Sequence, residues 1–131
     1  MKSVTISDTE PSRNILAFDL KEILRAIGPV VESLQWRLAG IDCTGEGSDE
    51  LHELCDSDAL VSGAHLVALS ERILQTINGE FLGFRADAPD HATPWLIIRA
   101  VDSTAFDVDC DDPAVLSAVR RRFVDVRDMP A

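Results

Sequence analysis

Several features that mark well-known classes of protein are absent from this chain of 131 residues. It has no tyrosine and no array of aromatic residues suited to stacking on sugars, which argues against a glycosidase. No apolar run reaches membrane-spanning length, and Met1–Thr5 lacks the core of a signal peptide. There is also no internal repeat or low-complexity segment. These absences favour a single globular domain in the cytoplasm, and the chain is long enough to bury a core.

Cysteine is scarce as well. Cys43, Cys55 and Cys110 are an odd number at irregular spacing, which favours reduced thiols over a framework of disulfides. A thiol enzyme would require a cysteine next to an oriented histidine. Cys43, at the end of a predicted strand, and His91, in a loop bounded by prolines, are the most accessible candidates for such a pair.

Positive charge is in short supply. Twelve basic residues face 23 acidic ones, which gives a net charge of −11. No Lys or Arg occurs from Leu38 to Glu71, where eight acids stand, and Arg99 is the one base from Asp87 to Asp112. Such a surface repels nucleic acids and anionic membranes and attracts basic proteins. The acids are therefore either a solubilising surface or a docking surface for a basic partner.

The stretch from Ile73 to Phe123 is predicted to organise the fold as four short antiparallel strands followed by a helix. Asn78-Gly79 lies between two apolar runs, Ile73–Ile77 and Glu80–Arg85. Because Asn-Gly favours the two-residue turn of a β-hairpin, these runs are predicted to pair with each other.

A second hairpin is predicted from Trp95–Val101 and Ala105–Cys110. A three-residue turn between them sets Arg99 opposite Asp107 as an ion pair and collects the apolar residues on the other face. That inward face consists of Leu96, Ile98, Ala100, Phe106, Val108 and Cys110. The outer face then carries Trp95, Ile97 and Val101 beside Arg99, Asp107 and Asp109.

Capping residues predict several helices. Asp112 and Pro113 suit the start of a helix whose apolar stripe is Val115, Leu116, Val119 and Phe123. Asp19 followed by Glu22 resembles a capping box and begins a helix that ends at Gly28-Pro29. Further elements are predicted as a strand over Gln35–Cys43, helices from Ser48 and from Ser62, and a last strand around Val124 and Val126.

These elements predict a single α+β domain over residues 14–131. Its antiparallel meander has four to six strands, helices pack on the sheet, and a C-terminal helix closes the chain. Residues 1–13 contain little hydrophobicity and are predicted to form a flexible N-terminal arm.

Two sets of residues resemble metal ligands. His52 and Cys55 share a helix face, and Cys43 and His65 would complete four ligands, but these spacings match no zinc motif. The alternating acids Asp107, Asp109 and Asp111 resemble half of a calcium loop. That loop lacks its glycine and its bidentate glutamate, because Asp112 and Ala118 occupy those positions. We therefore predict neither a metal site nor a cofactor.

The favoured hypothesis is a small, non-enzymatic cytosolic protein whose acidic surface engages a basic protein. Inhibitors and immunity proteins that neutralise basic nucleases or toxins use the same principle, and the analogy is one of charge and size. A small thiol- or metal-dependent enzyme and a subunit of a homo-oligomer are the alternatives. The predicted partner-binding residues are Trp95, Asp107, Asp109, Asp49, Glu50 and Glu53. The alternative for the outer face of the second hairpin is that the helix Asp19–Ile27 covers it and that Trp95 belongs to the core.

Overall fold

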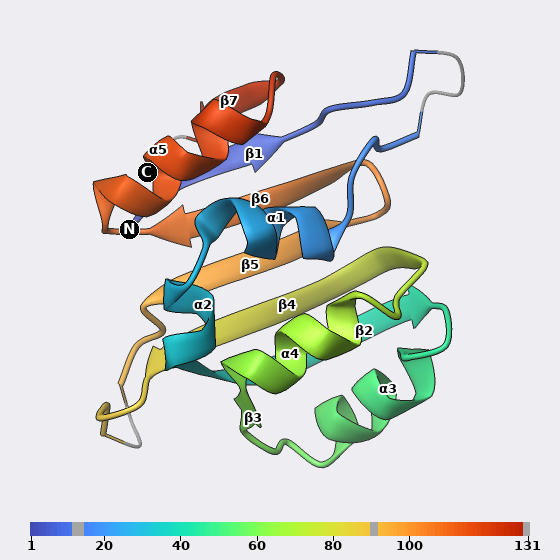
Figure 1. The fold of residues 1–131 in the computed structure, drawn as a ribbon, viewed down its shortest axis with the longest axis vertical. Helices are drawn as coiled ribbons and strands as arrows, with labels where there is room; N and C mark the ends of the chain where they lie inside the picture. The colour runs from blue at the N-terminus through green and yellow to red at the C-terminus, as the bar shows by residue number, and fades with distance from the viewer. Residues whose placement is uncertain (12–14, 90–91, 130–131) are drawn as a thin grey trace.

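The structure is a computed structural model that describes residues 1–11, 15–89 and 92–129. The described part is an α+β fold with five helices and one sheet of seven antiparallel strands (Figure 1). The strands lie side by side in the order β3-β2-β4-β5-β6-β1-β7. The elements are β1 (Lys2–Ile6), α1 (Leu20–Ile27), α2 (Val30–Ser33), β2 (Leu34–Thr44), α3 (Ser48–Asp56), β3 (Val61–Ser62), α4 (Gly63–Ser70), β4 (Gln75–Arg85), β5 (Leu96–Val101), β6 (Ala105–Cys110), α5 (Pro113–Arg122) and β7 (Val126–Met129).

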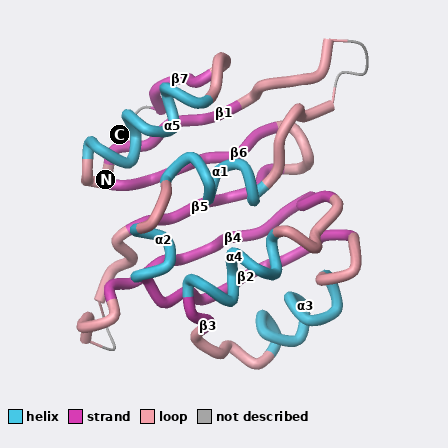
Figure 2. Tube along the Cα trace, in the orientation of Figure 1, coloured by secondary structure: helices cyan, strands magenta, loops and turns pink. Residues whose placement is uncertain are grey.

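The helices cover one face of the sheet. Figure 1 shows α1, α2, α4 and α5 in front of the strands, and Figure 2 shows α3 beyond β2. Between the two layers lie the largest buried side chains, Trp36, Phe81 and Phe106, each of which contributes about 1.5–3 kcal/mol by its burial. The opposite face carries no helix in the described part of the chain. We refer to it as the open face, with the side chains Thr5, Arg37, Glu80, Leu82, Phe84, Ile97, Arg99, Asp107 and Asp109.

The second hairpin has the predicted register. Ile98 pairs with Val108, Arg99 with Asp107, and Val101 with Ala105, so a three-residue turn joins the strands. All six residues of the predicted inward face are buried. Alternation along β5 and β6 therefore confirms the predicted direction of every side chain in this hairpin.

The predicted helix caps are also present. Asp19 Oδ1 accepts a hydrogen bond from Leu20 N at 2.8 Å, and α1 ends at Gly28, whose φ of 92° suits glycine. Asp112 caps α5 by accepting from Ala114 N at 2.9 Å, with Pro113 in its first turn. The apolar stripe of α5 is buried as expected.

The predicted turn at Asn78-Gly79 is wrong, because β4 runs through both residues as one strand. Asn78 pairs with Asp42 of β2, and Gly79 pairs with Ala100 of β5. The glycine permits close packing, since a Cβ there would lie 2.8 Å from Ile41 Cδ1. Pairing with a strand on each side outweighs the local preference of Asn-Gly for a turn.

The N-terminal prediction is also corrected. Residues 2–6, expected within a flexible arm, form β1 between β6 and β7, with Val4 and Ile6 fully buried. This strand and β3 were not predicted, and the sheet of the described residues has seven strands instead of four to six. The expected strand near the C-terminus is present as β7, after the helix that was predicted to close the chain. Residues 12–14 lie outside the described part.

Both edges of the sheet are short. β3 pairs with β2 only at Gln35 and Trp36, and α3 lies along the remaining part of β2 (Figure 1). On the other side, β7 has four residues, two of which, Arg127 and Asp128, are charged. Short, charged or covered edges oppose pairing with other chains. Within the described residues, no helix has both the length and the apolar character needed to cross a membrane.

Candidate functional site

The acidic residues of the open face are tied to neighbouring side chains. Arg99 Nη1 donates to Asp109 Oδ2 at 2.5 Å, and its Nε donates to Glu80 Oε2 at 3.1 Å. These contacts, led by the hydrogen bond to Asp109, raise the pKa of the Arg99 guanidinium above its usual value. The side chain of Asp109 is only 13% exposed. Arg99 therefore neutralises part of the negative charge on this face.

The predicted ion pair between Arg99 and Asp107 is wrong in its partner, although the register is right. Asp107 Oδ1 accepts a hydrogen bond from Thr5 Oγ1 of β1 at 2.7 Å. The long arginine side chain reaches the diagonal residue Asp109, because diagonal neighbours in a sheet lie within its span. Both aspartates thus have partners within the sheet.

Trp95 lies at the end of β5 beside a hollow of about 750 Å³. The hollow is lined by Trp95, Ile97 and part of the β4–β5 loop, including Pro89 and Pro94. The guanidinium carbon of Arg85 lies 4.7 Å from the centre of the Trp95 ring, within the range of a cation–π contact.

Helix α1 does not cover the open face, so that part of the alternative is wrong, although Trp95 packs against the core as the alternative assumed. The buried residues of α1, which are Leu20, Ile23 and Leu24, belong to the core on the other side of the sheet. Trp95 itself is half-buried, and with Ile27 it lines a small second hollow of about 240 Å³ at the strand end.

Helix α3 presents its acids on one side. Asp49, Glu53 and Asp56 follow one another at spacings of four and three residues, which form a single stripe on a helix, and all three are exposed. Leu51, on the opposite side, is buried. None of the three acids takes part in an ion pair within the described residues. We call Asp49, Glu53 and Asp56 the acidic stripe.

Glu50, predicted with the same group, differs from its neighbours. Its Oε2 lies 2.6 Å from Nε2 of His65, and its Oε1 lies 3.9 Å from Nη1 of Arg72. It therefore links α3 to α4 and the turn that follows, instead of adding an unpaired charge.

The six predicted partner-binding residues do not form one surface. Trp95, Asp107 and Asp109 belong to β5, β6 and their ends, whereas the acids of α3 lie beyond β2 (Figure 1). β2 and β6 are separated by β4 and β5, a distance of about 14 Å at the usual strand spacing.

The candidate thiols lie in unfavourable surroundings for catalysis. Cys43, expected to be the most accessible, is buried, and burial together with the charges of Asp19 and Asp42 raises its pKa to about 11. Burial also raises the pKa of Cys110, whose Sγ donates to the Trp95 carbonyl at 3.3 Å. Since the thiolate is the nucleophile, neither site suits that role. The candidate His91 lies outside the described residues.

The described residues hold no set of three or more His, Cys, Asp or Glu side chains arranged to bind a metal ion. His52 and Cys55 are half-buried on α3, while Cys43 is buried in β2. The alternating Asp107, Asp109 and Asp111 follow the two-residue repeat of β6 and its end.

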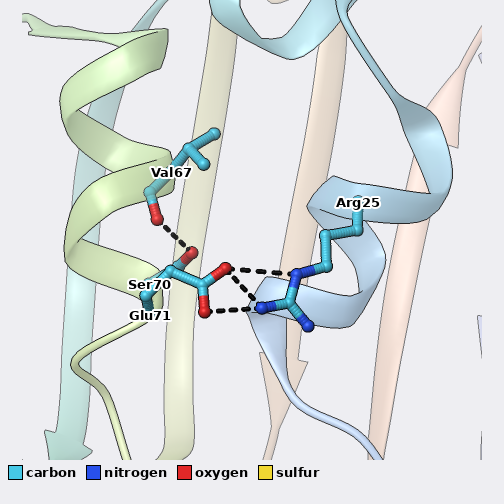
Figure 3. A network of polar contacts seen from close by, with 4 residues as sticks. All are labelled: Arg25, Val67, Ser70 and Glu71. Atoms are coloured by element: carbon cyan, nitrogen blue, oxygen red, sulfur yellow. Dashed lines mark hydrogen bonds and ion pairs between the residues drawn. The ribbon is translucent and has the colours of Figure 1, made fainter.

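Two further acids, Glu22 and Glu71, lie on or against α1. Figure 3 shows Arg25 of α1 reaching Glu71 at the end of α4, with Nη2 at 2.6 Å from each carboxylate oxygen. This bidentate pair leaves Glu22, one turn earlier, without that arginine. Glu22 Oε2 is buried and has no hydrogen-bond partner within the described residues.

Sequence reasoning did not predict that Glu22 has a buried carboxylate oxygen without a described hydrogen-bond partner. The spacing of Asp19 and Glu22 was assigned to a capping box, but the Asp19 carboxylate accepts from Leu20 N instead of Glu22 N, so neither hydrogen bond of that motif is among the described ones. The contact of Arg25 with a residue 46 positions away has no local signal in the sequence.

Comparison of the chain with protein-family models, with curated proteins and with solved structures gives no match.

Proposed function

We propose that this chain is a small binding protein, without catalytic activity of its own, that engages a basic protein through acidic residues on and before α3. The observation that carries the proposal is the contrast in pairing. The acids of the open face are bound to Arg99 or Thr5, whereas the acidic stripe has no ion pair among the described residues. Asp42 in β2 and Glu46 in the loop before α3 are also exposed.

Charge supports this role in two ways. A net charge of −11 attracts a basic partner over long range and accelerates the encounter. Unpaired carboxylates on a rigid helix also require no rearrangement before they bind. Among acidic binding proteins, an inhibitor of a basic nuclease or toxin fits best, because clustered carboxylates imitate the phosphates that such an enzyme recognises. Three free cysteines support a location in the cytoplasm.

Affinity capture with charge-matched variants tests the proposal. The wild-type chain, the variant Asp49→Lys/Glu53→Lys and the control Glu32→Lys/Asp87→Lys are immobilised, and a native lysate is applied at low salt. Each double variant adds four charges, which changes the net charge from −11 to −7. We expect one basic protein to elute from the wild type and the control as salt rises, and to be missing from the α3 variant. Equal recovery from all three columns would overturn the proposal.

A homo-oligomeric subunit is a second candidate, and the open face favours it. Leu82, Phe84 and Ile97 are half-buried there with no helix over them in the described structure. A second copy could cover these residues face to face, with Trp95 at the margin. Sedimentation at high concentration tests this candidate, because it requires a dimer that Phe84→Ser dissociates. A monomer at every concentration would rule it out.

A further inference from the structure

The open face is almost neutral in charge. It carries two arginines and three acids, whereas the whole chain has a net charge of −11. Two copies of so acidic a chain repel each other over long range, and the repulsion is weakest where the facing surfaces carry little net charge. The open face is therefore suited to contact with a second copy, as the acidic stripe is not.

The registers of β2, β4, β5 and β6 arrange the side chains of the open face in rows across the sheet. One row follows from the pairs Arg37–Leu82, Leu82–Ile97 and Ile97–Asp109. It has two apolar side chains in its middle and opposite charges at its ends. Among the described residues, Asp58 contacts Arg37 at Nε, at 3.1 Å, and the two Nη groups have no ion pair.

The next row has the same complementary order. It follows from the pairs Ala39–Glu80, Glu80–Arg99 and Arg99–Asp107. Its two central members carry opposite charges, and Arg99 Nε donates to Glu80 Oε2 at 3.1 Å. In both rows, the side chain from β4 is therefore a suitable partner for the side chain from β5.

We infer that a second copy covers the open face, related to the first by a two-fold axis that runs along the strands between β4 and β5. The arrangement rests on the second candidate function, the homo-oligomer, and does not use the acidic stripe. Rotation about this axis lays β5 of the second copy over β4 and lays β6 of the second copy over β2. Aligned sheets of this kind pack about 10 Å apart, with their facing side chains interdigitated.

This axis brings complementary groups together in both rows. The facing residues form one apolar contact and two contacts between opposite charges: Leu82 with Ile97, Glu80 with Arg99, and Arg37 with Asp109. Each contact occurs twice, because a two-fold interface is self-complementary. An axis across the strands would instead set Arg37 over Arg37 and Arg99 over Arg99. Like charges that face each other are unfavourable, so charge selects the axis along the strands.

Ala39 is the position that tests the direction of the axis. It is half-buried and borders a hollow of about 360 Å³ that Glu80, Arg99 and Val101 also line, so a longer side chain has room there. In the inferred dimer, Ala39 faces Asp107 of the second copy. With an axis across the strands, it would face Ala39 of the second copy.

Sedimentation equilibrium of the full chain at about 0.15 M salt measures the Kd of the dimer. Ala39→Lys and Ala39→Glu place opposite charges on the open face, and Val124→Lys and Val124→Glu are the matched controls at a residue that is 94% exposed. We expect Ala39→Lys to lower Kd about fivefold and Ala39→Glu to raise it about fivefold, since each dimer contains the contact with Asp107 twice. The Val124 variants should stay close to wild type.

Opposite effects of the two Ala39 variants would support the inferred axis. Equal weakening by both variants would overturn it in favour of an axis across the strands, and no change in either would place the dimer interface on another surface. A monomer at every concentration would overturn the second candidate function together with the inference and leave the open face to a different partner. Binding of a basic protein is measured separately with Asp49→Lys/Glu53→Lys, so failure of the dimer leaves the leading proposal intact.

Discussion

The acidic residues of the open face and those of α3 carry the same charge but are held differently. On the open face, Arg99 and Thr5 bind the carboxylates of Asp109 and Asp107. On α3, the acidic stripe makes no ion pair among the described residues, and Leu51 is buried on the other side of the helix. A high count of acidic residues is therefore a poor guide to a docking surface, because pairing decides which acids a partner can use.

The largest expected effect comes from Gly45, which couples α3 to the start of β4. Its φ of 117° disfavours other residues, and an added Cβ would lie 2.4 Å from Leu74 N and 2.8 Å from the Arg72 carbonyl oxygen. We expect Gly45→Ala to lower the free energy of unfolding by about 3 kcal/mol, as measured by urea denaturation. It should also weaken binding through the acidic stripe.

Gly40 provides the matched control for this change. It has a φ of 59°, but a Cβ there would meet no atom within 4 Å. Gly40→Ala should therefore cost only the strain of the left-handed backbone, about 1 kcal/mol. If both alanine variants lost the same free energy of unfolding, the close packing of Gly45 against Leu74 would add nothing to stability beyond the backbone strain.

A loss of intermediate size is expected at Arg99. Arg99→Met leaves Asp109 and Glu80 without their shared cation, and the side chain of Asp109 is only 13% exposed. Loss of this charge-assisted hydrogen bond should lower the free energy of unfolding by about 2 kcal/mol in thermal or urea denaturation. Arg121→Met, at an exposed position of α5, is the control and should change stability little. A similar result for both variants would mean that the acids of the open face need no cation, and the contrast with α3 would disappear.

The acidic stripe should respond in the opposite way. Asp49→Asn/Glu53→Gln removes two negative charges from a chain with a net charge of −11, and it breaks no ion pair among the described residues. We expect the free energy of unfolding to stay within about 0.5 kcal/mol of wild type in urea denaturation, while binding to a basic partner weakens. A marked loss of stability would reveal a structural role for the stripe and remove the reason to regard it as a docking surface.

The sequence predicted those parts of the fold in which local signals agree with one another. Along β5 and β6, the alternation of apolar residues and the length of the turn require the same register, and this hairpin was predicted correctly. Asn78-Gly79 failed because its local preference conflicts with pairing to β2 and β5, neither of which adjoins it in the sequence. The alternation of Val4 and Ile6 marked β1, but five residues gave too short a signal.

The candidate site was less accessible to sequence reasoning. The count of acids identified α3 and β6 equally, although Asp107 and Asp109 have partners within the sheet and the acidic stripe has no ion pair among the described residues. That difference depends on contacts between distant residues, such as Thr5 with Asp107, which spacing does not encode. Cys43 was assigned to an accessible strand end for the same reason, whereas the packing of the sheet buries it.

The smallest expected effect uses Cys43 as a reporter of the negative charge near α3. Burial, aided by Asp19 and Asp42, raises its pKa from the ordinary 9.0 to about 11. Because the raised pKa belongs to the folded state, the unfolded thiol loses its proton first as the pH rises. The contribution to stability is therefore complete below pH 9 and is lost as the pH passes through about 11. Comparison of urea denaturation for wild type and Cys43→Ala over this range should show the extra decline only in the wild type.

Asp42→Asn removes one of the two charges and should lower the pKa of Cys43 slightly, as measured by thiolate absorbance during a pH titration. Asp107→Asn removes an equal charge from the open face, three strands away from β2, and is the control. If both variants moved the pKa equally, the negative potential at Cys43 would come from the net charge of the whole chain. A shift in Asp42→Asn alone would show that the charge near α3 acts locally, and local charge of this kind is what a basic partner would encounter there.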